Sequence, residues 1–155
     1  MLIEDNEDDA FFMKLALKKA GVENPLFVAT DGQRAIELLQ EAMNGMDRDE
    51  DGSPVIPCLV LLDLKLPKLR GHEVLKWIRQ QPALKTIPVV VLSASPDDHD
   101  IETAYELGAN SYFAKPSDTD GLIQLVKLLS HYWLNRCLPP PTCIEKPPEL
   151  CVTPE

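Results

Sequence analysis

Short apolar runs alternate along the chain with longer segments in which apolar residues recur every three or four positions. The runs at residues 59–63 (LVLLD) and 89–93 (VVVLS) are almost wholly aliphatic, which is typical of strands buried on both faces of a sheet. Residues 1–4, 26–30 and 111–114 form three further short runs that predict strands.

The periodic segments predict five helices, one after each strand, at residues 8–20, 33–43, 71–79, 98–107 and 121–135. Strict alternation of strands and helices predicts an α/β fold, a doubly wound parallel sheet of five strands with helices on both faces. Six prolines after residue 136 predict an extended tail at 137–155, so we expect one domain at 1–136.

Composition narrows the class of protein. The chain has 155 residues, of which 45% are hydrophobic and 26% charged, as in an ordinary globular domain. Its formal charge of -10 argues against binding to nucleic acid, because that binding depends on lysine and arginine at phosphates. No apolar run approaches the roughly 20 residues of a membrane span, and no signal peptide precedes the first strand. We therefore expect a cytoplasmic protein without a membrane partner.

Polar side chains gather at the predicted ends of the strands. Glu4 and Asp5 follow the first strand, Asp63 and Ser93 end the third and fourth, and Lys115 follows the fifth. Ligands of doubly wound sheets bind at this edge. Three neighbouring carboxylates repel one another until a cation binds, and oxygen ligands suit Mg²⁺. An aspartate there can form an aspartyl phosphate while Lys115 and Ser93 neutralise the phosphoryl oxygens. The pattern predicts a phosphate receiver.

Four motifs at these strand ends resemble the receiver domain of two-component response regulators. They are EDN at residues 4–6, LLDLKLP around Asp63, VLSAS around Ser93 and SYFAKP around Lys115. Their order and separations match the family over residues 1–136. The resemblance implies a (βα)5 flavodoxin-like receiver with strand order 2-1-3-4-5.

A narrower resemblance rests on three segments. These are NEDDAFFMKLALKKAG at residues 6–21, the acidic insertion before the third strand, and HYWLNRCLP at residues 131–139. They are similar to the small stand-alone regulators that serve phytochrome-like and related sensor histidine kinases. That resemblance implies a kinase of this class as partner.

The resemblance also implies roles for the residues that bind the metal and accept phosphate. Asp63 would be phosphorylated by a histidine kinase, with Mg²⁺ held by Asp5, Asp63 and the backbone carbonyl of Lys65. Glu4 would bind the metal mostly through water. Lys65 and Ser95 stand at positions that tune the lifetime of the phosphoryl group in the family.

Further roles concern the switch itself. Ser93 would turn its hydroxyl onto the phosphoryl group, and Tyr112 would change rotamer with it, although plain packing is an alternative for this aromatic residue. Lys115 would pair with the phosphate, and the Lys115–Pro116 peptide bond would be cis. A cis bond before proline costs only about 0.5–1 kcal/mol.

Three features depart from the pattern or extend it. Arg70 precedes Gly71, which alters the charge of the third loop, and the first strand has only three residues before Glu4. A strand this short suggests that a few native N-terminal residues are missing. The apolar surface of the last helix is wider than one stripe. The family uses its last strand and helix for dimers, so the resemblance implies a homodimer.

Three functions compete. The leading hypothesis is a single-domain switch that signals through protein contacts and is not an enzyme. A phosphatase of the haloacid dehalogenase type would use a second aspartate two residues after the nucleophile, but position 65 is lysine. A receiver-like scaffold that is never phosphorylated is the alternative, although no pocket residue of the family pattern is lost.

Overall fold

The computed structural model describes residues 1–45, 56–94 and 97–136. Ser95 and the tail at 137–155 lie outside these residues. The strands are β1 (Leu2–Ile3), β2 (Val28–Ala29), β3 (Val60–Leu62), β4 (Val89–Ser93) and β5 (Ser111–Ala114). The helices are α1 (Glu7–Lys19), α2 (Gly32–Met43), α3 (Gly71–Gln80), α4 (Asp98–Glu106) and α5 (Thr119–Leu129), followed by the π-helical turn η1 (Ser130–Leu134).

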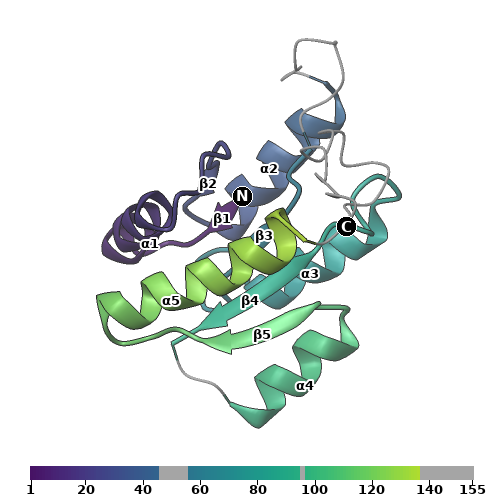
Figure 1. The fold of residues 1–155 in the computed structure, drawn as a ribbon. Helices are drawn as coiled ribbons and strands as arrows, with labels where there is room; N and C mark the ends of the chain where they lie inside the picture. The colour runs from purple at the N-terminus through teal and green to yellow at the C-terminus, as the bar shows by residue number, and fades with distance from the viewer. Residues whose placement is uncertain (46–55, 95–96, 137–155) are drawn as a thin grey trace, which may run out of the picture.

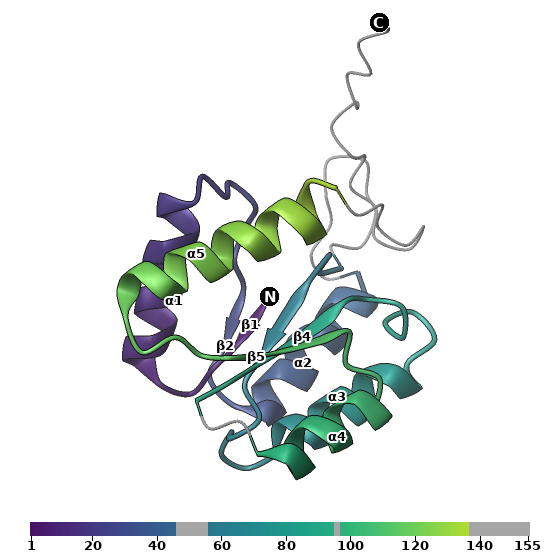
Figure 2. The ribbon, with the colours of Figure 1, turned by 60° about the horizontal axis from the view of Figure 1, so that its bottom comes forward.

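The strands form one parallel sheet in the order β2-β1-β3-β4-β5. Figures 1 and 2 show their arrows running in one direction, so their carboxyl ends meet at one edge. Ile3 pairs with Leu62, Leu62 with Val91, and Val91 with Tyr112. The predicted α/β fold class and strand order are confirmed.

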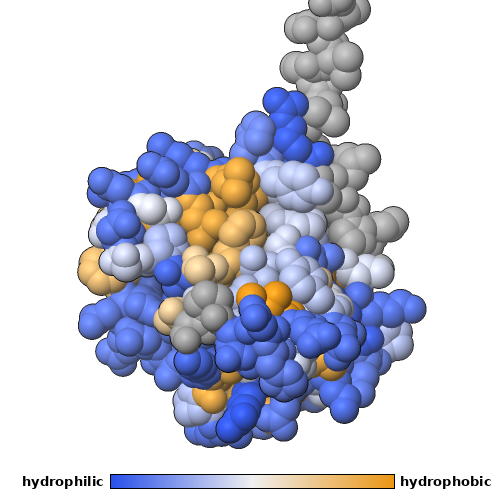
Figure 3. Space-filling model, turned by 90° about the horizontal axis from the view of Figure 1, so that it is seen from below, coloured by the Kyte–Doolittle hydropathy of each residue, from blue (hydrophilic) through white to orange (hydrophobic). Residues whose placement is uncertain are grey.

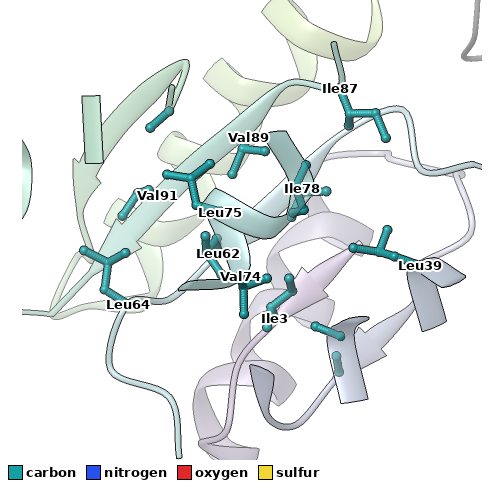
Figure 4. Close-up of a cluster of buried hydrophobic side chains, with 14 of the residues drawn as sticks. Ile3, Leu39, Leu62, Leu64, Val74, Leu75, Ile78, Ile87, Val89 and Val91 are labelled. Carbon is teal, nitrogen blue, oxygen red and sulfur yellow. The ribbon is translucent and has the colours of Figure 1, made fainter. Parts of the chain in front are cut away.

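Helices cover both faces of the sheet. Figure 2 shows α1 and α5 on one face and α2, α3 and α4 on the other. Successive strand residues point to opposite faces, so Leu61 packs on the side of α1 and α5 while Leu62 packs on the side of α3. Figure 4 shows Leu62 and Val91 of the sheet beside Val74 and Leu75 of α3. The two central strands are apolar throughout because both of their faces are buried.

Capping side chains set where the helices begin. The Oδ1 atom of Asn6 accepts hydrogen bonds from the N–H groups of Asp8 and Asp9, at 2.9 and 3.0 Å, so α1 begins one residue before the predicted start. Asp118 accepts from the N–H of Gly121 at 2.8 Å, and α5 therefore begins at Thr119 instead of residue 121.

The last helix also ends differently from the prediction of residues 121–135. Its regular part stops at Leu129, and the chain continues in a π-helical turn. The Ser130 hydroxyl donates to the carbonyl of Lys127 at 3.1 Å, and the N–H of Asn135 donates to the carbonyl of Ser130, five residues back.

Among the described residues, no helix combines the length and apolarity that a membrane span requires.

Candidate functional site

Three acidic side chains meet at the carboxyl edge of the sheet. Glu4 follows β1 and Asp63 follows β3, and both are buried, with 4% and 7% of their surface exposed. Asp5 is exposed. Each of the three offers a carboxylate oxygen within 4.8 Å of the others. The predicted acidic cluster is therefore assembled by the pairing of β1 with β3.

Lys115, directly after β5, reaches into this cluster. Its Nζ lies 2.5 Å from Asp63 Oδ2, 2.6 Å from Glu4 Oε2 and 3.0 Å from Asp9 Oδ2. Burial by itself lowers the pKa of Lys115, but the hydrogen bonds to Asp63, Glu4 and Asp9 outweigh it and raise this pKa above its ordinary value. The ammonium therefore stays charged in the site.

The charges of the cluster do not balance. Burial raises the pKa of Glu4 above its ordinary value, and Lys115 only partly opposes this effect. One ammonium faces the four carboxylates of Glu4, Asp5, Asp9 and Asp63. An all-oxygen cluster with this excess of negative charge fits a divalent cation such as Mg²⁺.

The turn after β3 orients Asp63. The backbone N–H of Lys65 donates to Asp63 Oδ1 at 3.0 Å. A Cβ added to Gly71 would lie 2.3 Å from the Asp63 carbonyl oxygen, so only glycine fits where α3 begins against this strand. The metal-binding role predicted for the Lys65 carbonyl is not tested by the contacts of the described residues, and it stays a prediction.

Ser93 and Tyr112 lie on the neighbouring strands. Ser93 is fully buried at the end of β4, and its carbonyl accepts the N–H of Lys115 at 2.8 Å. Tyr112 packs half-buried against the core, and its buried hydroxyl has no hydrogen-bond partner among the described residues. A buried hydroxyl without a partner fits a side chain that changes position. The rotamer change itself stays a prediction.

The Lys115–Pro116 peptide bond differs from the prediction. No peptide bond between described residues is cis, so the expected cis bond is wrong. The trans form is the more stable one by about 0.5–1 kcal/mol, and Lys115 reaches all its carboxylate partners with it. Pro116 lines a cavity of about 270 Å³ between α1 and α5, together with Asp9, Phe12 and Leu122.

The sequence reasoning missed two features of this edge. Asp9 contacts Lys115, and its place in the first turn of α1, in the same acidic run as Glu4 and Asp5, was a usable signal. Asp31 follows β2, and its Oδ2 lies 2.6 Å from Lys68 Nζ. The rule that singled out the ends of the other strands applies equally to Asp31.

Comparisons with known proteins agree with this geometry. The family model described as response regulator receiver domain matches residues 1–127. The chain is 37% identical over 135 residues to response regulator Rcp1 of Synechocystis sp., covering 87% of this chain and 88% of Rcp1. It is also 37% identical over 135 residues to the probable methanogenesis regulatory protein FilR2 of Methanothrix harundinacea, covering 87% and 83%.

Two solved structures have the same fold. The phosphorylated cyanobacterial phytochrome response regulator RcpA matches with a TM-score of 0.78 and 37% identity, over 90% of this chain and 95% of RcpA. The Mn²⁺-bound form of Rcp1 matches with a TM-score of 0.75 and 37% identity, over 90% and 96%.

Proposed function

We infer that Asp63 is the phosphoacceptor of this chain, which belongs to the response regulator receiver domain family and accepts a phosphoryl group in two-component signalling. One observation carries the assignment. The Asp63 carboxylate is buried at the edge of the sheet, 2.5 Å from the Lys115 ammonium and within reach of the oxygens of Glu4 and Asp5. The ammonium, together with a divalent cation held by these carboxylates, would supply the positive charge that a dianionic phosphoryl group needs around it.

The reaction is an in-line transfer from a phosphohistidine donor. An Asp63 carboxylate oxygen forms a bond to phosphorus as the P–N bond breaks, and the electron pair of that bond stays on the imidazole nitrogen. Lys115 exchanges an Asp63 oxygen for a phosphoryl oxygen. The Ser93 hydroxyl donates to another phosphoryl oxygen, and Tyr112 moves with it.

The metal of this site is Mg²⁺ in our proposal. Asp5, Asp63 and the carbonyl of Lys65 would hold it directly, and Glu4 through water. When bound, the cation offsets negative charge on the carboxylates and on the transferred phosphoryl group. Receiver domains bind a divalent metal, and Rcp1 has been solved with Mn²⁺. Lys65 and Ser95 would adjust the phosphoryl lifetime.

The phosphoryl donor is a sensor histidine kinase in our proposal, of the phytochrome-like class. Its support is the 37% identity to RcpA, whose structure is that of a phytochrome response regulator. We also propose a cytoplasmic location, and a receiver domain that ends at residue 136. Trp133 and Leu134 pack against the core, which supports this boundary beyond the end of α5.

Self-association is a second proposal, with another copy of this chain as the partner. Figure 3 shows apolar residues gathered on the face that carries β5 and α5. Leu128 of α5 is 58% exposed, and β5 is an edge strand of the sheet. Sedimentation equilibrium of the chain and of Leu128→Glu tests this proposal. A weaker dimer in the variant would support it, and an unchanged dimer or a monomeric parent would contradict it.

The chain acts as a switch and not as a multiple-turnover enzyme in our proposal. Lys65 stands where a phosphatase with an aspartate nucleophile would use its acid. A scaffold that is never phosphorylated is the alternative, and the intact pocket of Glu4, Asp5, Asp63 and Lys115 argues against it.

Intact-mass measurement with Mg²⁺ and acetyl phosphate tests the assignment of Asp63. We expect one added phosphoryl group in the parent chain and none in Asp63→Asn. The matched control is Asp98→Asn, an exposed aspartate at the start of α4, which should gain the group as the parent does. An equal adduct in Asp63→Asn would refute the assignment. No adduct in the parent, with Mg²⁺ binding established by calorimetry, would favour the scaffold.

A further inference from the structure

An ion pair ties the loop between β3 and α3 to the start of α2. Lys68 Nζ lies 2.6 Å from Asp31 Oδ2, and Asp31 Oδ1 accepts the N–H of Arg34 at 2.8 Å. The side chain of Asp31 is 11% exposed. Its hydrogen bond with Lys68 lowers the pKa of Asp31 below the ordinary value. The Lys68 side chain is 68% exposed, so the pair is enclosed on the Asp31 side and open to water on the Lys68 side. The buried carboxylate and its second hydrogen bond to Arg34 fix the Asp31 end of the contact.

The backbone of the loop is unusual at the same residue. Lys68 has a φ of +63°, and it is the only residue other than glycine with a positive φ in the described part of the chain. The left-handed region is unfavourable for a residue with a side chain, so the surroundings must hold Lys68 there. Next to Asp31, a Cβ on Gly32 would lie 2.2 Å from the carbonyl oxygen of Leu69. The start of α2 and the tip of the loop are therefore fitted closely together.

The same loop carries the phosphoacceptor. It begins at Asp63, whose Oδ1 accepts the N–H of Lys65. Leu64 and Leu66 anchor its inner side in the core. Its outer side, at the tip, is tied by the bond from Lys68 to Asp31. Movement of the tip would shift the Lys65 carbonyl, because only two residues separate it from Lys68.

We propose that Asp31 and Lys68 form a latch that positions the loop of Asp63 and Lys65 for binding of the divalent cation, and thereby for phosphoryl acceptance. The proposal rests on the proposed function of Asp63. Neither latch residue touches the reacting atoms, so both are positioning residues.

A purely electrostatic effect and a positioning effect predict different changes in cation affinity when Asp31 or Lys68 is replaced. Through space alone, removal of the Lys68 charge strengthens cation binding to the acidic cluster, and removal of the Asp31 charge weakens it. If the pair acts by holding the loop, either loss weakens binding. Losing both then weakens binding no further than losing one, because the two residues act through a single contact.

The variants are Asp31→Ser, Lys68→Met, the double variant and Lys68→Arg, all in the full chain. Serine still caps α2 but is too short to reach Lys68. Methionine keeps a side chain of similar length, and with it the backbone strain. Arginine restores the charge and the hydrogen bond. Lys85→Met, at an exposed lysine, is the control for loss of one positive charge.

Mn²⁺ affinity, measured by electron paramagnetic resonance, is the first measurement. We expect both single variants and the double variant to bind about threefold to tenfold more weakly, less than the 10–100-fold effect of direct partners of metal ligands. Lys68→Arg and Lys85→Met should bind as the parent does. Amide hydrogen exchange in chelator is the second measurement. Residues 64–70 should exchange faster in Asp31→Ser and Lys68→Met, with α4 unchanged as a sign of intact folding.

Opposite shifts of affinity in Asp31→Ser and Lys68→Met, or additive effects in the double variant, would overturn the latch. Unchanged affinity in all variants would overturn it too. The phosphoryl adduct on Asp63 is scored separately in the parent chain. If the parent chain is phosphorylated on Asp63 and the latch variants bind Mn²⁺ as the parent does, the proposed function is supported and the latch is refuted. A parent labelled elsewhere refutes the function, and the Mn²⁺ data still decide the latch.

Discussion

Lys115→Met tests whether the ammonium holds the acidic cluster together. The substitution leaves Glu4 and Asp63 buried, with carboxylate oxygens as much as 4.8 Å apart. Two unit charges at this distance repel by about 3.5 kcal/mol at an effective dielectric constant of about 20. Removing one partner from a buried ion pair costs a similar amount, about 3–5 kcal/mol. We expect the free energy of unfolding at neutral pH to fall by about 3 kcal/mol in chelator.

A divalent cation should recover most of this loss, because it neutralises the same oxygens. At a concentration of 100 times its dissociation constant, a ligand that binds only the folded state adds about 2.7 kcal/mol. The variant should also bind Mn²⁺ more tightly than the parent, so its stabilisation by a given concentration of cation is larger. A lower pH should also recover part of the free energy of unfolding that Lys115→Met loses. The pKa of Glu4 is already raised by burial, and loss of Lys115 raises it further. Protonation therefore relieves the repulsion as the pH falls.

Urea denaturation of both proteins, in chelator and in Mn²⁺, measures these differences. Lys85→Met controls for the loss of a positive charge on the surface and should unfold as the parent does. Two results would refute the reasoning. One is equal stability of Lys115→Met and the parent in chelator, and the other is equal stabilisation of both by Mn²⁺.

Two further substitutions, and the pH dependence of Lys68→Met, test other contacts. Gly71→Ala puts a Cβ against the carbonyl of Asp63, and we expect a loss of about 1–3 kcal/mol from overpacking together with a lower yield of phosphoryl adduct; unchanged stability and yield would contradict this. Arg79→Met removes hydrogen bonds to backbone carbonyl groups on two segments, and urea denaturation should show a loss of about 2–3 kcal/mol, whereas a loss below about 0.5 kcal/mol would mean that water replaces them. The pKa of Asp31 is lowered by its bond to Lys68, so this pair stabilises the fold above the ordinary aspartate pKa and loses that effect as the pH falls through the lowered value. The stability difference between the parent and Lys68→Met should therefore vanish in acid, and a constant difference would exclude the ion pair as its cause.

The sequence by itself determined the elements and the edge of the sheet where the chemistry lies. Apolar runs without polar interruptions occur where both faces of a strand are buried, and β4 was predicted without error for this reason. Asp63, Ser93 and Lys115 follow from the same local rule, because each stands at or just after the end of a strand. The predicted starts of α1 and α5 were wrong by one and two residues, because the capping bonds of Asn6 and Asp118 decide them.

Only the tertiary structure decided which side chains share the site. Asp9 and Lys115 are 106 residues apart, and their contact depends on how α1 packs beside the loop after β5. The pairing of Asp31 with Lys68 depends likewise on the fit of Gly32 against Leu69. Sequence spacing encodes the direction of a side chain within one element. The distance between elements is set by packing of the whole core, because close-packed side chains from distant segments fix it together.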